Sequence, residues 1–155
     1  MPSRFTATAE GRANVLLTSC HVAPVFDPQG PADARREYRE YHAIWDTGAT
    51  NTVISHRVVN ECGLKQAGIE RVRDTHEVRW CRAYYVNLWM MNDMLFVGRR
   101  VTRANLTGTD ILIGMDIIGE GDFAVTSNDG NTVFSFRVPS MECIDFVKAD
   151  AEGLR

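Results

Sequence analysis

One short segment constrains the fold and chemistry of this chain more than any other. Residues 43–53 run from an apolar stretch into Asp46, Thr47 and Gly48, and the apolar pattern then resumes. Asp and Gly are common in turns, so this tripeptide alone also fits an ordinary turn of an unrelated β domain. A second segment, residues 111–118, follows about 65 residues after Asp46 and places Gly114 behind an apolar run. Each segment occurs once.

The pattern along the rest of the chain is mostly that of β-strands. Residues 35–45 alternate with period two and so deliver Asp46 to the end of a strand. Asp129 and Gly130 are typical of a hairpin turn between two strands. Further extended segments are expected at residues 14–26, 77–90, 95–101, 123–126 and 132–138. These segments predict a mainly β fold, a closed barrel-like domain.

Helix signals are few. Ser55 can cap a short helix over residues 56–62, which Gly63 would end. A terminal helix is expected over about residues 140–150, with Ile144 and Val147 on its apolar face. We therefore expect two or three short helices in a single domain spanning residues 1–155, with its core over about residues 12–140.

Composition narrows the classes of partner. The 155 residues are 45% apolar and 24% charged with a net charge of −3, which gives no reason to expect nucleic-acid binding. No apolar run reaches the roughly 18 residues needed to cross a bilayer, so no membrane partner is expected. The N-terminal residues lack the apolar region of a secretory signal, which favours a cytoplasmic protein.

Cysteines and histidines do not form metal-binding patterns. The four cysteines are widely separated, which indicates free buried thiols in a reducing compartment rather than a disulfide framework. The four histidines lack the spacing of metal ligands. We therefore expect no metal and no other cofactor.

Residues 43–53 and residues 111–118 together resemble the retropepsin-like family of aspartic proteases. The resemblance is greatest to its cellular and bacterial single-domain branch. Residues 46–50 match the catalytic Asp-Thr-Gly motif of the family, and residues 112–114 match its apolar-apolar-Gly signature. The segment from Gly114 to Ile118 is similar to the version found in the cellular and bacterial members. The resemblance covers about residues 12–140.

The resemblance implies an aspartic endopeptidase that works as a homodimer. Hydrolysis without a metal needs one group that takes a proton from water and another that protonates the leaving amine. Two carboxylates that share one proton can do both. Because the chain carries one such motif, Asp46 finds its partner as Asp46 of a second subunit, which a two-fold axis brings close. The predicted partners are therefore a second copy of the chain and a peptide or protein substrate.

The resemblance also assigns roles to individual residues. Asp46, Thr47 and Gly48 are the predicted catalytic residues, and Ile113 and Gly114 are predicted to support the site from below. The predicted substrate-binding residues are Ala49, Thr50, Asn51 and Leu112, together with Thr75 and His76 at the tip of a flap hairpin.

The flap leaves a second function open. The family's flap closes over substrate and usually has a glycine-rich tip, whereas residues 72–82 contain no glycine. The alternative is a non-proteolytic module that keeps the scaffold and serves in peptide binding or dimerisation, since fold does not guarantee chemistry.

Overall fold

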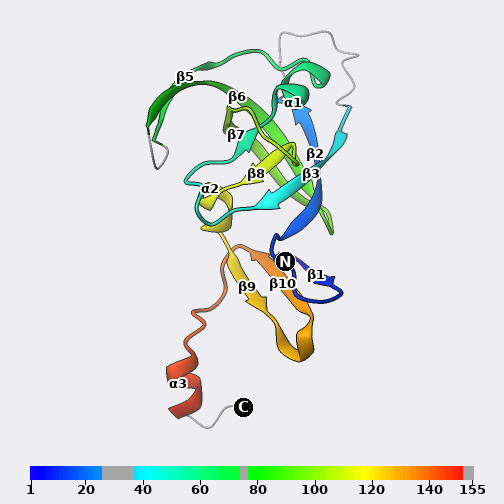
Figure 1. Cartoon of the computed structure of the whole chain (residues 1–155), viewed down its shortest axis with the longest axis vertical. Coiled ribbons are helices and arrows are strands. Elements are labelled where there is room, and N and C mark those ends of the chain that lie inside the picture. The colour runs from blue at the N-terminus through cyan, green and yellow to red at the C-terminus, as the bar shows by residue number, and fades with distance from the viewer. Residues whose placement is uncertain (26–36, 74–76, 152–155) are drawn as a thin grey trace.

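Ten strands and three short α-helices make up the parts of the chain that the computed structural model describes, residues 1–25, 37–73 and 77–151 (Figure 1). The mainly β architecture confirms the predicted fold class. The elements are β1 (Ser3–Ala9), β2 (Leu17–Pro24), β3 (Arg39–Trp45), β4 (Val53–Ile54), α1 (His56–Glu61), β5 (Gly68–Arg73), β6 (Val78–Met90), β7 (Met94–Arg103), β8 (Ile111–Ile113), α2 (Met115–Ile118), β9 (Asp122–Thr126), a 3₁₀ turn (Asn128–Gly130), β10 (Thr132–Val138) and α3 (Phe146–Ala151).

Six strands close into a barrel. Their order is β2, β3, β8, β4, β7 and β6, and pairing of β2 with β6 completes the ring. Aliphatic side chains such as Val22, Val86, Val101 and Ile111 fill the interior with no exposed surface. Strand β5 pairs only with β6 in this sheet, so the β5–β6 hairpin projects beyond the barrel wall (Figure 1).

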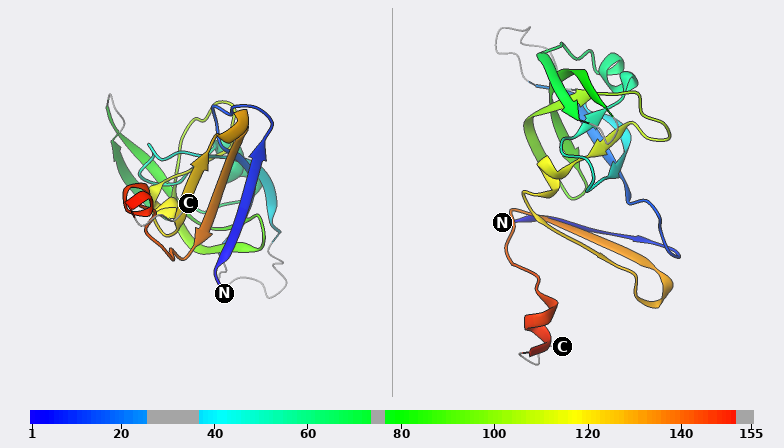
Figure 2. Two further views of the ribbon diagram at one scale, coloured as in Figure 1. Left: turned by 90° about the horizontal axis from the view of Figure 1, so that it is seen from below. Right: turned by 60° about the vertical axis from the view of Figure 1, so that its left-hand side comes forward.

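A separate three-stranded sheet lies below the barrel, in the order β1, β10, β9 (Figure 2). Strand β1 pairs with β10 along its whole length, from Ser3 opposite Val138 to Ala9 opposite Thr132. The expected core boundary near residue 12 is therefore wrong, because Phe5 is 3% exposed and belongs to the core. Phe5 is an isolated apolar residue in its segment of the sequence, so no strand was predicted there. Pairing with the distant strand β10 stabilises β1.

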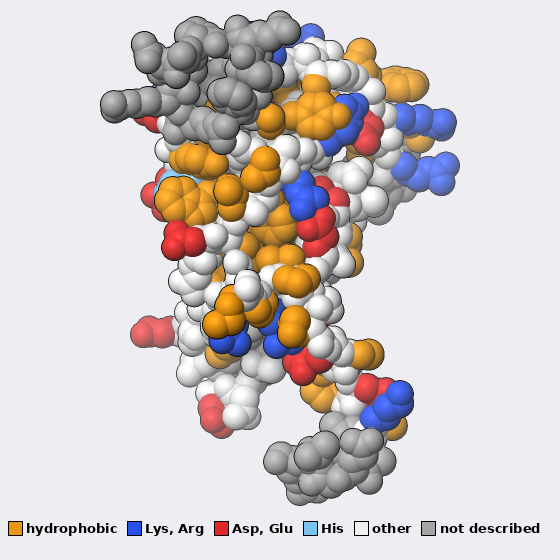
Figure 3. All heavy atoms as spheres, turned by 180° about the vertical axis from the view of Figure 1, so that it is seen from behind, with side chains coloured by type: hydrophobic (Ala, Val, Ile, Leu, Met, Phe, Trp, Pro, Cys, Tyr) orange, Lys and Arg blue, Asp and Glu red, His pale blue; other side chains and the backbone are white. Residues whose placement is uncertain are grey.

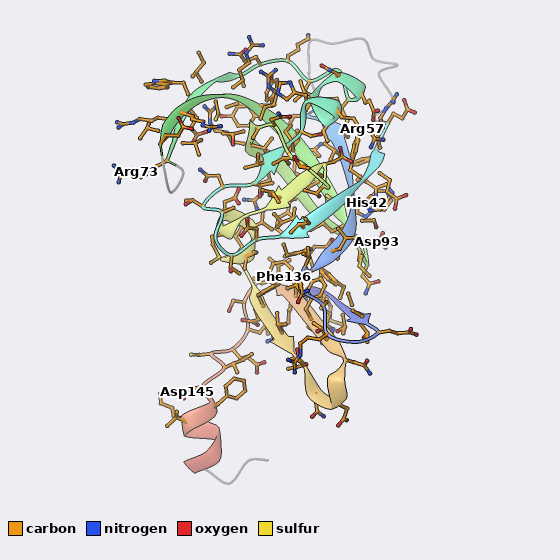
Figure 4. The ribbon with its side chains drawn as sticks, in the orientation of Figure 1. His42, Arg57, Arg73, Asp93, Phe136 and Asp145 are labelled. Carbon is orange, nitrogen blue, oxygen red and sulfur yellow. The ribbon has the colours of Figure 1, made fainter. Side chains whose placement is uncertain are left out.

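Aromatic side chains join the two sheets. The Trp45 ring at the end of β3 lies 4.9 Å from that of Phe136 and 5.5 Å from that of Phe5, measured between centroids. It also stacks on Phe123 at 5.9 Å with nearly parallel planes. Figure 4 shows Phe136 at this junction, between the barrel and the lower sheet. The strand that leads to Asp46 is thereby fixed to both sheets.

Several local predictions are confirmed. The Ser55 side chain caps α1 by accepting a hydrogen bond from the backbone N–H of Val58. Gly63 follows that helix with φ +59°, a conformation that glycine adopts without strain. The turn at residues 128–130 joins β9 to β10 as the Asp-Gly pair predicts.

The predicted C-terminal helix is wrong in its start and its environment. It begins at Phe146, six residues later than expected, because the Asp145 carboxylate accepts hydrogen bonds from the N–H groups of Val147 and Lys148. Residues 140–145 are not helical. The expected apolar face is exposed: Ile144 by 50%, Phe146 by 77% and Val147 by 82%.

All four cysteines are free thiols. Cys20 is buried as expected, and burial raises the pKa of its thiol to about 12. Cys62 and Cys81 are half-buried, and Cys143 is exposed because it lies in the segment that leads to α3, so uniform burial is a wrong expectation. Within residues 1–25, 37–73 and 77–151, no helix has the length and apolarity to cross a bilayer.

Candidate functional site

The loop that carries Asp46 covers the end of a short central strand. Strand β8 pairs in parallel with β3 and antiparallel with β4, so it lies between them. Residues 46–52, which connect β3 to β4, must therefore pass over the end of β8. This threading brings the two sequence segments together, as the resemblance implies.

Backbone contacts fix the Asp46 carboxylate. The Asp46 N–H donates to the carbonyl of Ile113 at 2.9 Å. The Gly48 N–H donates to Asp46 Oδ1 at 2.9 Å, and the Ala49 N–H donates to the Asp46 carbonyl at 3.1 Å. A Cβ at residue 48 would lie 3.1 Å from Oδ1, so glycine permits this close approach. One carboxylate oxygen is thus oriented by the loop itself.

The other half of the loop is fixed to the start of α2. The N–H of Met115 donates to the Ala49 carbonyl at 2.8 Å, and the N–H of Asp116 donates to the Thr50 carbonyl at 3.1 Å. These bonds satisfy donors in the first turn of a helix, where no intrahelical acceptor exists. Ala49 and Thr50 therefore hold the loop through their backbones.

Thr52 adds a buried link that sequence reasoning missed. Its hydroxyl accepts a hydrogen bond from the Gly114 N–H at 3.1 Å and donates to Asp116 Oδ1 at 2.8 Å. The residue is fully buried. The sequence does not single out Thr52, because Thr47, Thr50 and Asn51 are polar residues of the same loop.

Gly114 allows the loop to lie directly against β8. A Cβ there would lie 2.6 Å from the carbonyl carbon of Asn51 and 2.9 Å from the carbonyl oxygen of Ala49. Its φ of −94° is open to any residue, so space and not backbone conformation demands glycine. Ile113 and Gly114 thus both contact the Asp46 loop, and their role in supporting an active site stays a prediction.

A cavity of about 380 Å³ opens beside Asp46. Asp46 is the one carboxylate among its described lining residues. Val15 and Val125 at its rim are 51% and 46% exposed, which is high for aliphatic side chains. The lining residues are Asn14, Val15, Leu16, Ile44, Trp45, Asp46, Thr47, Phe123 and Val125. An exposed apolar surface thus surrounds a single acidic group.

The cavity also borders the edge of the lower sheet. Phe123 and Val125 belong to β9, which in the described structure pairs on one side only, with β10. Sequence reasoning missed these wall residues because they lie about 77 positions after Asp46. The short apolar run from Phe123 to Val125 was the only signal, and such a run indicates a strand without indicating its neighbour.

The remaining predicted substrate-binding residues are not gathered at this cavity. Ala49, Thr50, Asn51 and Leu112 do not line it, and Leu112 lies in the centre of β8, opposite Ile44 and Val53. The predicted flap falls on the β5–β6 hairpin, whose last described pair joins Arg73 to Val78. Thr75 and His76 lie outside the described residues.

Comparison with known proteins supports the fold. No protein-family model matches the sequence, and no curated protein matches it. A retropepsin-like aspartic protease from Rickettsia conorii is similar over 89% of this chain and 96% of its own, with a TM-score of 0.54 and 8% identity. The retroviral protease-like domain of Ddi1 from Leishmania major covers 79% of this chain and 95% of its own at 15% identity, with a TM-score of 0.46. The similarity to the Rickettsia protein shows that this chain has a retropepsin-like fold.

Proposed function

We propose that the chain is an aspartic endopeptidase that acts as a homodimer, with one Asp46 from each subunit in a shared active site. The observation that carries the proposal is the Asp46 carboxylate, which is oriented by the Gly48 N–H and lines an open cavity as its one described acidic group. The retropepsin-like fold agrees with this type of chemistry.

The proposed reaction is the addition of water to a peptide carbonyl. One Asp46 carboxylate takes a proton from the water while the oxygen of that water bonds to the carbonyl carbon. The protonated Asp46 of the second subunit donates a hydrogen bond to the carbonyl oxygen. When the C–N bond breaks, the leaving nitrogen receives a proton from the pair, so protons and charges balance.

Two further features support assembly through the Asp46 face. Val15 and Val125 form an exposed apolar rim at the cavity, and burying such surface favours association. Strand β9 presents an edge with backbone groups that can pair with another strand. A two-fold axis near Asp46 would cover both features at once.

We propose that substrate binds in an extended form between the Asp46 loop and the β5–β6 hairpin, with its backbone paired as an added strand. Thr47 lies at the cavity with an exposed side chain and would brace the pair of loops across the dimer. Contacts from Ala49, Thr50, Asn51 and Leu112 to substrate, and from Thr75 and His76 at the flap tip, stay predictions. The four free thiols agree with the reducing cytoplasm expected for the protein.

The test is cleavage of a diverse peptide library by the purified chain from acidic to neutral pH. We expect cleavage that a statine-type transition-state mimic blocks. Asp46→Asn should abolish it and leave the dimer intact by size-exclusion chromatography. Asp93→Asn is the matched control, because Asp93 lies in the β6–β7 turn with φ +56°, where asparagine is favourable. Intact peptides with the wild-type chain would instead favour the peptide-binding or dimerisation module, and activity in Asp46→Asn would contradict the proposal.

A further inference from the structure

One face of the β5–β6 hairpin carries arginine and apolar side chains only. Residues directly opposite in an antiparallel pair project to the same side of the sheet. The pairs on this face are Ile69 with Arg82, Arg71 with Trp80, and Arg73 with Val78. We call these six residues the basic face of the hairpin. It contains three positive charges and, among the described residues, no negative one.

The basic face is open to solvent. Trp80 is 73% exposed, Ile69 60% and Val78 39%, and the three arginines are also exposed. In the described parts of the chain, Arg71, Arg73 and Arg82 form no ion pair. Figure 3 shows blue and orange side chains together at the upper right, where the hairpin projects, and Figure 4 places Arg73 at its outer end. A tryptophan so exposed among unpaired arginines is uncommon in a surface without a partner.

The opposite face of the hairpin has the reverse arrangement. Glu70 pairs with Arg100 at 3.2 Å, and Glu77 pairs with Arg79. Glu70 and Arg79 occupy the alternate strand positions and so project away from the basic face. Glu77 lies just before β6 and pairs with this Arg79. Both described acidic residues of the hairpin are therefore neutralised on one side, and the positive charge of the other side is left for a partner.

The basic face continues the interior side of the barrel. Along β6, Trp80 and Arg82 alternate in step with Tyr84 and Val86, whose side chains are buried in the core. The surface therefore lies on the inward side of the projecting hairpin, the side that the proposed function assigns to substrate. A surface in this position faces the proposed substrate. It does not face outward from the barrel wall, so we assign it to substrate recognition.

We propose that the basic face binds acidic, extended segments of polypeptide substrates, an inference that rests on the proposed protease function. Arg71 and Arg73 lie on the same side of one strand, so their backbone positions are roughly 7 Å apart. An extended peptide repeats its side chains at the same interval, so carboxylates at alternate positions match the two guanidinium groups. Ile69, Val78 and Trp80 would receive a large apolar side chain of the same segment.

Single-stranded nucleic acid is the other polyanion that binds arginine and tryptophan. The face favours a peptide because two of its three apolar residues are aliphatic and offer no ring for base stacking.

Binding to the Asp46→Asn protein tests the proposal without turnover. The probes are fluorescein-labelled twelve-residue peptides with a central Leu-Phe pair and either glutamate or glutamine at alternate positions, and a twelve-nucleotide oligo(dT). Fluorescence anisotropy should show that the glutamate peptide binds most tightly and weakens with added salt. Arg71→Glu combined with Arg82→Glu should weaken its binding about tenfold, whereas Lys148→Glu, far away on α3, should leave it unchanged.

Two results would overturn the inference: equal affinity for the glutamate and glutamine peptides, or tighter binding of oligo(dT). Cleavage by the wild-type chain separates this inference from the proposed function. Cleavage without preference for acidic flanks refutes the role of the basic face and leaves the protease proposal intact. Selective binding of the glutamate peptide without cleavage supports the basic face and refutes the protease proposal.

Discussion

The hydroxyl of Thr52 donates a hydrogen bond to the carboxylate of Asp116 at 2.8 Å, across 64 positions of sequence. The same hydroxyl accepts the N–H of Gly114. This buried link holds the end of the Asp46 loop against the start of α2, and it explains how a loop carries a carboxylate in a fixed position. The position of the Asp46 loop thus depends in part on Thr52 and Asp116, which do not line the cavity beside Asp46.

Thr52→Val should lower the free energy of unfolding by about 1–3 kcal/mol, because it leaves the buried Gly114 N–H without its acceptor. Thr52→Ser keeps the hydroxyl and is the matched control. Urea unfolding followed by circular dichroism measures both. Equal stability of the valine and serine variants would show that the hydroxyl contributes nothing to the loop.

Gly114→Ala should destabilise the chain more than Gly108→Ala. At residue 114 the new methyl group meets the backbone of Asn51 and Ala49, and at residue 108 it meets open space but adopts φ +79°. We expect about 1 kcal/mol for the strained conformation at residue 108 and about 3 kcal/mol or more for the overpacked contact at residue 114. Thermal unfolding of the two variants measures the difference, and a larger loss at residue 108 would contradict the close approach of the loop to β8.

Phe136→Ala should destabilise the chain by about 3–5 kcal/mol, because it opens a cavity in the aromatic junction beneath Trp45. Phe146→Ala, the same change at a residue that is 77% exposed on α3, should change stability by less than about 0.5 kcal/mol. Hydrogen exchange should localise the effect of Phe136→Ala to β1, β9 and the end of β3. Similar losses from the two substitutions would show that the junction does not stabilise the fold.

Local signals in the sequence predicted much of the barrel and of the Asp46 loop. Some signals act only on the adjacent backbone and can therefore be predicted from the sequence alone. They are Ser55, Gly63 and the Asp129-Gly130 pair. Strand alternation before Asp46 likewise reflects burial of one side of β3.

Long-range packing accounts for what the sequence did not predict. Phe5 belongs to a strand only because β1 pairs with β10. Phe123 contributes to the junction by stacking on Trp45. These two contacts join distant segments, which periodicity does not report. The start of α3 is the exception, because it depends on a local cap by the Asp145 carboxylate.

The carboxylate of Asp122 should make the segment after β10 sensitive to acid. Hydrogen bonds from the Ser140 hydroxyl and the Met141 N–H, together with Arg137, lower its pKa from 3.8 to about 2. A lowered pKa stabilises the folded state fully above the ordinary value, and this contribution is lost as the pH falls from about 4 towards 2. Asp122→Asn should therefore increase hydrogen exchange at residues 139–142 at pH 7, and the difference from wild type should shrink as the pH falls from about 4 towards 2. A difference that does not change with pH would contradict the assignment.

The sharing of one active site by two copies of Asp46 is tested most directly by mixing subunits. Wild-type and Asp46→Asn chains are unfolded together in equal amounts, refolded, and assayed on a peptide that the wild-type dimer cleaves. If each site needs two Asp46 carboxylates, random pairing leaves about one quarter of the activity of an all-wild-type sample, because mixed dimers are inactive. Retention of about one half of the activity would mean that each chain works independently, and would contradict the shared site.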